Sequence, residues 1–368
     1  MGYAIALDIG TTNIQALLLD NTSKRQIDYL STKNSQAIYG EDIITRLGLS
    51  LRNKDIQKRI NKSIIEDLAL LVGLILKRKG LSIDGLEKVV ACGNSAMHHI
   101  LLGLPLEGLA AAPFKPVHKE RIFETTLEEL GIKIDAGKNE IPFIFLPNLG
   151  GFVGSDALCV IVETGMHESE KPILAIDLGT NGEIILGSNK KIFVTSTSAG
   201  PAFEGWRIKC GVYGSTLIDI ISNLLKDKRI DKSGFMKRGP YFYEVEKRTV
   251  EVTQKDIREF QLAKAAISCG VNILKRYYGD QKIAKVLITG LFGAKINKSN
   301  AKLVGILPEG IDLNKVEIKQ DTALLGARTL LLFRNIEKKL NPIIKKIEHI
   351  ELHKEPLFQD AFTSAIHF

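Results

Sequence analysis

The sequence has few of the residues that build metal and disulfide sites. Four cysteines occur in 368 residues, none of them in a Cys-x-x-Cys pair: Cys92, Cys159, Cys210 and Cys269. Spacings this wide exclude the close thiolate clusters that hold zinc or an iron–sulfur cluster. Each cysteine stands beside small or apolar residues, so we expect buried free thiols in a reducing compartment and no iron–sulfur cluster in this chain.

Long hydrophobic runs are also missing. No apolar run approaches the roughly 20 residues needed to span a bilayer. The first residues, MGYAIALDIG, lack the basic region and cleavage site of a signal peptide and read at once as a strand. These absences predict a cytoplasmic protein with no membrane partner.

Several common ligand-binding motifs do not occur. The chain has no G-x-x-x-x-G-K-[ST] sequence and no G-x-G-x-x-G opening a helix after a strand, which disfavours a P-loop and a Rossmann dinucleotide site. The net charge is +8, but the positive residues are dispersed, apart from a Lys-rich stretch at 338–354 that we interpret as a solvated helix face. No nucleic-acid-binding signature accompanies this stretch, so no nucleic-acid partner is expected.

The most informative feature that is present is a duplicated pattern. Residues 3–20 contain DIGTTN and residues 172–187 contain DLGTNGE, each time as an apolar strand ending in Asp, a Gly-Thr turn and a second apolar strand. This order is typical of a β-hairpin. One such hairpin is explained by an ordinary turn, whereas two in register with repeated downstream elements indicate a duplicated unit.

The segments after each hairpin correspond as well. The first half continues with a helix at 55–78 and a strand at 86–94. The second half continues with a helix from Thr253, a good N-cap with Asp256 at its third position, to about 276, and then a strand at 284–290.

Each half then closes with a helix rich in small residues, at 151–163 and 321–332. Small residues let two helices approach closely, which suits a crossing at a hinge between lobes.

Alternating strands and helices predict an α/β fold with partly parallel sheets covered by helices. The length favours two lobes. We expect an N-terminal lobe at 1–170, a C-terminal lobe at 171–332 and a tail at 333–368 that packs on the core. The charged segment 227–252, punctuated by Gly-Pro, reads as an insertion.

The hairpin turns carry the predicted chemistry. Backbone N–H groups of such a turn bind phosphate oxygens, and the preceding aspartate can hold a hydrated Mg²⁺. Asp8 and Asp177 are therefore the candidates for catalysis and for Mg²⁺ held through water. Two such hairpins facing each other would bind the triphosphate of ATP from both sides, through the predicted phosphate loops Gly10, Thr11, Thr12, Asn13, Gly179, Thr180, Asn181 and Gly182.

A glycine-rich loop follows the strand at 284–290. Gly290 and Gly293 would let the backbone approach an adenosine closely, with Phe292 beside the base or ribose. The alternative is a strand-to-helix turn that needs glycine for its conformation. Beside the paired hairpins, the nucleotide interpretation is favoured.

Residues 195–205, rich in hydroxyls, follow the second hairpin. Here Gly200 and Pro201 are candidate nucleotide contacts, and Glu204 could position the attacking water, with a structural capping role as an equal alternative. Asp156 is a rival base, although a favourable charge at a helix N-terminus explains it better. The His98-His99 pair is interpreted as structural, because helix neighbours point in different directions and no third ligand is evident.

Together these residues resemble the actin-like ATPase (ASKHA) superfamily and, within it, the ATPase region of the reductive activators of corrinoid proteins. The resemblance spans residue 7 to about 330. It is carried by DIGTTN, AIYGEDIITR, CGNSAMHHILLGLP, LPNLGGFVGSDA, DLGTNGEI, STSAGPAFEGWRIKCG, VTQKDIREFQLAKAAI and ITGLFGAKI.

The resemblance implies that ATP hydrolysis drives electron transfer to the cobalt of an inactive corrinoid protein, taking it from Co(II) to the methyl-accepting Co(I) state. It also implies a homodimer. Such activators pass the electron through an attached iron–sulfur domain, and this chain lacks the cluster-binding cysteines. We therefore expect a separate low-potential electron donor such as a ferredoxin, unless an iron–sulfur domain was removed or this paralogue has another role.

Three other functions fit the same fold. One is a small-molecule kinase with a sugar or acyl acceptor in the cleft. The second is a nucleotide-dependent scaffold without turnover. The third, activation of a dehydratase or reductase through a bridging cluster, is disfavoured by the missing bridging cysteines.

Overall fold

The computed structural model describes residues 2–40, 42–111, 114–134, 140–179, 181–198, 214–245, 248–279, 281–290 and 293–368. The chain folds into two compact units. Unit 1 comprises residues 1–165 and 322–347, and unit 2 comprises residues 166–321 and 348–368. Each unit is built on a six-stranded mixed sheet covered by helices, which is the predicted α/β class.

The sheet of unit 1 has the strand order β3-β2-β1-β4-β6-β5. Strands β1, β2 and β3 form an antiparallel meander, and β4 and then β6 continue the sheet in parallel. The strand bounds are β1 Tyr3–Ile9, β2 Asn13–Asp20, β3 Gln26–Lys33, β4 Leu86–Gly93, β5 Phe123–Thr126 and β6 Pro142–Phe145.

Strand β1 shows why helices cover both faces of this sheet. Its large apolar residues Tyr3, Ile5, Leu7 and Ile9 alternate with smaller ones and join a core cluster with helix α2. The opposite face, where Asp8 lies, packs against helix α9, which contacts both β1 and β4. The helices of this unit are α1 Ile43–Arg52, α2 Lys54–Arg78, α3 Ser95–Leu101, α4 Glu107–Ala110, α5 Ser155–Thr164, α9 Thr322–Leu331 and α10 Ile336–Ile344, with 3₁₀ turns η1 Ser35–Tyr39 and η2 Ile83–Gly85.

The sheet of unit 2 repeats the topology, with the order β13-β12-β7-β8-β9-β14. Strands β7, β8 and β9 form the meander, and β12 and β13 run parallel to β7. The strand bounds are β7 Ile173–Leu178, β8 Asn181–Gly187, β9 Ile192–Ser198, β12 Lys285–Thr289, β13 Val316–Ile318 and β14 Ile347–His349.

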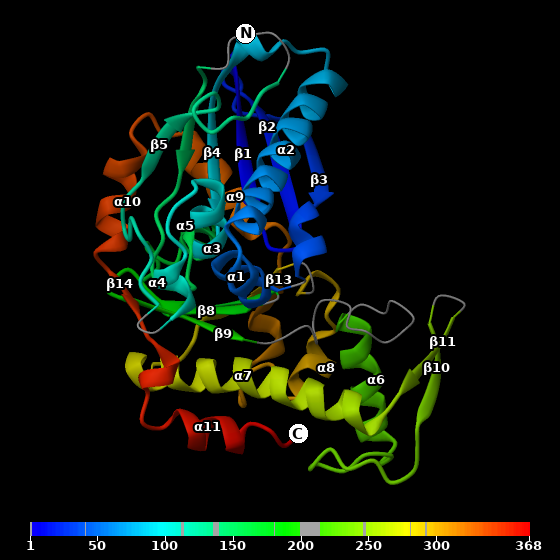
Figure 1. Cartoon of the computed structure of the whole chain (residues 1–368). Coiled ribbons are helices and arrows are strands. Elements are labelled where there is room, and N and C mark those ends of the chain that lie inside the picture. The colour runs from blue at the N-terminus through cyan, green and yellow to red at the C-terminus, as the bar shows by residue number, and fades with distance from the viewer. Residues whose placement is uncertain are drawn as a thin grey trace. The chain divides into compact units, whose positions relative to one another are not determined.

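Helix α7 is the main cover of this second sheet. It lies across β8 and β9, and helix α11 lies alongside it (Figure 1). The predicted cap is present, because Thr253 and Asp256 form a reciprocal capping box at the start of α7. The helices here are α6 Gly214–Lys226, α7 Gln254–Tyr278, α8 Lys298–Leu303 and α11 Phe358–Ser364, with 3₁₀ turns η4 Gly293–Lys295, η5 Leu313–Lys315 and η6 Leu352–Lys354.

The segment expected to be an insertion contains a separate two-stranded sheet, β10 Tyr241–Val245 and β11 Arg248–Val252. The expected lobes and the two units differ at the C-terminal end. Residues 322–347 belong to unit 1, and only 348–368 of the expected tail belong to unit 2.

The two helices with many small residues do pack closely, and both lie in unit 1. A Cβ atom added at Gly326 of α9 would come within 2.1 Å of the Cys159 carbonyl oxygen of α5. The missing side chain therefore sets how near the two helices can lie.

Candidate nucleotide-binding hairpins

The two predicted hairpins exist, and each places its aspartate near the carboxyl end of the central strand of its sheet. Asp8 of β1 lies opposite Gln15 on β2 and beside Cys92 on β4. Asp177 of β7 lies opposite Glu183 on β8 and beside Thr289 on β12. The two aspartates thus occupy equivalent positions in the two units.

The glycine two residues after each aspartate closes its turn with a backbone hydrogen bond. The N–H of Gly10 donates to the Asn13 carbonyl at 3.0 Å, and the N–H of Gly179 donates to the Asn181 carbonyl at 3.2 Å. These bonds hold the backbone of the turn next to the aspartate, where N–H groups can serve an anion.

A second glycine, at the end of the neighbouring parallel strand, packs against each hairpin. A Cβ atom at Gly93, the last residue of β4, would lie 2.6 Å from the Ile9 carbonyl oxygen. At Gly290, after β12, it would lie 2.4 Å from Asp177 Oδ1 and 2.5 Å from the Leu178 carbonyl oxygen. Gly290 also has a φ of +87°, which other residues rarely adopt. The predicted adenosine loop therefore begins in direct contact with the second phosphate hairpin.

Buried amides brace the first turn, and the sequence interpretation missed them. Asn34, fully buried, donates to the Gly10 carbonyl at 2.9 Å, and its own backbone N–H donates to the Thr12 carbonyl at 2.8 Å. Asn94 donates to Thr11 Oγ1 at 3.1 Å and caps helix α3. Asn94 could have been predicted, because an N-cap residue directly after a strand is a recognisable local pattern. No such pattern marks Asn34.

Asp156 lies in the first turn of α5, in unit 1. Its Oδ1 accepts the Ala157 N–H at 2.8 Å, which agrees with the expected charge at a helix N-terminus. Burial nevertheless raises the pKa of the Asp156 carboxyl to about 6, against the lowering effect of its backbone hydrogen bonds. A carboxyl that titrates near neutrality is a feature of catalytic bases, so the rival interpretation gains weight.

Two buried thiols feel the charges of both Asp8 and Asp156. Cys92 Sγ donates to Asp8 Oδ1 at 3.8 Å and to the Ala323 carbonyl at 3.7 Å. Burial raises the pKa of Cys92 and of Cys159, and the charges of both aspartates raise it further. Both carboxylates therefore act on the same pair of thiols at one end of the unit 1 sheet.

The cysteines are free and buried as expected at Cys92, Cys159 and Cys269. Some predicted residues lie outside the described ranges, and their assignment stays a prediction: Thr180, Gly200, Pro201, Glu204, Cys210 and Phe292.

The histidine pair is enclosed by protein. His99 Nδ1 donates to the Ser95 carbonyl at 2.7 Å, and its Nε2 accepts the Val117 N–H at 2.9 Å. His98 is fully buried, with its ring 4.6 Å from that of Phe145, and burial lowers its pKa to about 3. Neutral rings in this environment suit the structural interpretation.

The described residues contain no group of three or more His, Cys, Asp or Glu side chains placed to hold a metal ion. Nor do they contain a helix long and apolar enough to cross a membrane. Asp8 in unit 1 and Asp177 in unit 2 each offer a carboxylate, the hard oxygen ligand that Mg²⁺ takes alongside water.

Comparison with known proteins identifies the family. A family model described as the RACo middle region matches residues 3–169, and one described as the C-terminal domain of RACo, the ASKHA domain, matches residues 171–213 and 210–368. A solved structure of a reductive activator for corrinoid, iron–sulfur protein superposes with a TM-score of 0.87 at 28% identity, covering 100% of this chain and 66% of that chain.

Two characterised relatives extend the match. The corrinoid activation enzyme RamQ of Eubacterium limosum is 30% identical over 419 residues, which cover 98% of this chain and 69% of the relative. The Co(II) methylated amine-specific corrinoid protein reductase of Methanosarcina barkeri is 22% identical over 98% of this chain and 76% of its own length. This chain thus spans about two thirds of the first relative and of the solved structure. Through both of its units, the chain belongs to the RACo family.

Proposed function

We propose that this chain binds Mg–ATP and couples its hydrolysis to the reductive reactivation of a corrinoid protein from Co(II) to Co(I). The observation that carries the proposal is the repeated assembly of an aspartate, a glycine-closed turn and a second glycine in both units. The names of the relatives, which are a corrinoid activation enzyme and a corrinoid protein reductase, indicate the substrate class.

In this proposal each hairpin turn donates backbone N–H groups to the phosphates of ATP. Asp8 and Asp177 would hold Mg²⁺ through water, and the bound ion would neutralise charge on the phosphates. The loop that begins at Gly290 receives the adenosine. Catalysis then depends on positioning and on charge stabilisation rather than on a covalent intermediate.

Asp156 is our proposed proton acceptor for the attacking water. With a pKa of about 6, its carboxyl is mostly ionised at neutral pH and can still take up a proton. Water then attacks the terminal phosphorus of ATP, and ADP and phosphate leave. Glu204 remains a predicted alternative in the same role.

The redox step is assigned to a separate partner. One electron from a low-potential donor such as a ferredoxin reduces Co(II) to Co(I) on the bound corrinoid protein. ATP turnover in this chain couples to that step only if the corrinoid protein prefers one nucleotide state. A homodimer is part of the same proposal, since the family resemblance implies it.

The direct test is an ATPase assay with and without candidate corrinoid proteins, followed by the visible spectrum of cobalt under a low-potential reductant. We expect slow hydrolysis that the corrinoid protein stimulates, together with the appearance of Co(I). Hydrolysis that requires a small acceptor and yields its phosphate ester would instead assign a kinase. ATP binding without turnover, even beside the partner, would assign a scaffold.

Variants test the assigned residues. Asp8→Ala and Asp177→Ala should each lower ATP hydrolysis by about a hundredfold or more, because each removes a charge from the metal shell. Glu128→Gln, at an exposed position of unit 1, is the matched control and should keep wild-type turnover. Wild-type turnover in either aspartate variant would remove that residue from the proposed site.

The pH dependence of ATP hydrolysis tests the role of Asp156 as the base. In the wild type, kcat should rise as the pH passes about 6, because the Asp156 carboxyl must lose its proton to act as a base. Asp156→Asn should lower kcat and remove this acidic limb. A variant that keeps the limb would transfer the role to another group.

A further inference from the structure

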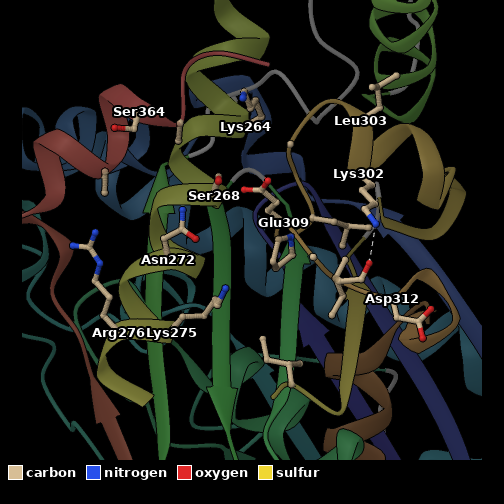
Figure 2. A pocket seen from close by; sticks show the side chains of 18 of the residues that line it. Lys264, Ser268, Asn272, Lys275, Arg276, Lys302, Leu303, Glu309, Asp312 and Ser364 are labelled. Carbon is tan, nitrogen blue, oxygen red and sulfur yellow. Dashed lines mark hydrogen bonds between the residues drawn. The ribbon is translucent and has the colours of Figure 1, made fainter. Parts of the chain in front are cut away.

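Unit 2 contains a large pocket that none of the proposed nucleotide chemistry uses. Its volume is about 1120 Å³, and it is bounded by one stripe of α7, by the loop 305–315 and by the C-terminal segment 360–368 (Figure 2). It borders the segment 281–283 before β12 and Lys315 before β13. Gly290 follows the other end of β12, so the pocket is separate from the adenosine loop.

Among the charged side chains that line this pocket, cations predominate. Six carry a positive charge, namely Lys264, Lys275, Arg276, Lys282, Lys302 and Lys315, against three acidic ones, Glu309, Asp312 and Asp360. Within the described residues, no carboxylate forms an ion pair with Lys275, Arg276, Lys282 or Lys315. We call this surface the basic pocket.

Three of the cations lie on α7, at the two ends of one stripe. Figure 2 shows Lys264, the neutral Ser268 and Asn272, and then Lys275 in succession on α7, at the spacing that places residues on one helix face. From Lys264 to Arg276 the stripe extends about 18 Å at the rise of an α-helix. Positive charge on α7 therefore stands at both ends of the stripe, with neutral side chains between them.

Contacts with the C-terminal residues hold the Lys264 end of the stripe in place. Lys264 is 2% exposed, its Nζ donates to the His367 carbonyl, and it lies over the ring of Phe368. Burial lowers the pKa of Lys264 to about 8. Lys302 on the opposite side donates to the Ile311 carbonyl at 2.9 Å, which fixes that wall.

We propose that the basic pocket docks an acidic segment of a partner protein. Charge complementarity requires that the occupant be negatively charged. The extent gives its class, because the volume exceeds the roughly 300–1,000 Å³ usual for small-molecule sites. The cations at the two ends of the α7 stripe are also far enough apart for an extended chain to reach both. A compact phosphate would need converging N–H groups such as a helix N-terminus provides, and α7 contributes its C-terminal half.

The basic pocket lies at the end of β12 away from Gly290, so we expect its occupant to bind independently of the nucleotide hairpins. An acidic segment would bind here whether or not ATP is present, so its binding and ATP hydrolysis can fail separately. If the acidic segment belongs to the corrinoid protein or to the electron donor, the basic pocket would dock a partner of the proposed reaction.

The test uses the full chain and a fluorescent peptide of about six glutamates, which when extended matches the length of the stripe. Binding is followed by fluorescence anisotropy at low and at high salt. The paired reversal Lys275→Glu with Arg276→Glu should weaken binding about tenfold or more, and salt should weaken it in the wild type. The matched control, Lys237→Glu with Arg238→Glu, reverses two adjacent exposed cations of unit 2 outside the pocket and should leave binding unchanged.

Each other outcome overturns the proposal. Inorganic polyphosphate that binds where the peptide does not would make this a phosphate site. A change in mass of the reversed variant in analytical ultracentrifugation would assign the surface to contact between copies of this chain. Equal peptide binding by wild type and variant, or none by a wild type with a normal thermal melt, would leave no docking role.

Discussion

Asp8 lies opposite the neutral amide of Gln15, whereas Asp177 lies opposite the carboxyl of Glu183. The turns differ too, because Ile9 pairs with Ile14 while Leu178 pairs with Gly182, so the second turn is one residue shorter. The topology and the supporting glycines are nevertheless the same in both units. The comparison indicates that the backbone around the aspartate is the shared element, and that the side chains facing it are where the units have diverged.

The largest expected effect comes from the supporting glycines. Gly290→Ala should lower the free energy of unfolding by about 3 kcal/mol or more, since the new Cβ meets backbone and the φ is unfavourable, and Gly93→Ala by about 2 kcal/mol. Gly310→Ala and Gly131→Ala, with positive φ and open space around them, are controls that should cost about 1 kcal/mol. Urea unfolding measures all four.

If Gly290→Ala proved no more costly than Gly310→Ala, the close approach to Asp177 would not matter for stability. The equivalence of the two units at this position would then be geometric coincidence.

Acid should affect unit 1 through His98. The folded state keeps this ring neutral to a pH of about 3, whereas the unfolded chain takes up its proton near 6.5, so stability is full above 6.5 and is lost as the pH falls below it. The loss should be about 1.4 kcal/mol for each pH unit over part of that range. His98→Leu should remove this contribution, and His353→Gln, at an exposed site, should not.

The measurement is urea unfolding at several pH values between neutrality and mild acid. An unchanged slope in His98→Leu would show that another group controls the acid sensitivity.

Asn34 tests whether the first turn depends on its buried brace. Asn34→Ala removes the donor to Gly10 and the acceptor for the Gln36 N–H, and should cost about 2 kcal/mol of unfolding free energy. Asn314→Ala, at an exposed position of unit 2, should be close to neutral. A neutral result for Asn34→Ala in chemical denaturation would contradict the assigned brace.

The smallest effect is expected from exchanging the residues that face the aspartates. Gln15→Glu places a like charge opposite Asp8 and should destabilise by about 1 kcal/mol or less, while Glu183→Gln should stabilise by a similar amount. Thermal melts without Mg²⁺ show whether each variant is more or less stable than the wild type. Equal shifts of the same sign in both variants would mean that the charge opposite the aspartate is not what separates the units.

Features set by local pattern could be predicted from the sequence. Helix α2 occupies 54–78 against an expected 55–78, and the α7 cap uses the two residues named for it. Periodic apolar spacing and capping side chains are local signals, which explains the agreement. Of the two glycines next to the hairpins, Gly290 was predicted as a nucleotide contact and Gly93 was not. The role of Gly93 depends on the neighbouring parallel strand, which no local pattern reveals.

Features set by distant contacts could not be predicted. Asn34 reaches Gly10 across 24 residues of chain, and no local pattern marks it. Helix α9 was assigned to the second half by its place in the sequence, yet the fit of Gly326 against α5 places it in unit 1. The basic pocket combines three segments between residues 264 and 368, so composition alone showed only dispersed charge.

The central claim is that both hairpins bind the same nucleotide, and hydrogen exchange with mass spectrometry tests it most directly. Mg–ATP should slow amide exchange in both segments, 8–15 and 177–183, while the β10–β11 hairpin stays unchanged. Protection of one segment alone, or of neither at saturating Mg–ATP, would contradict the account.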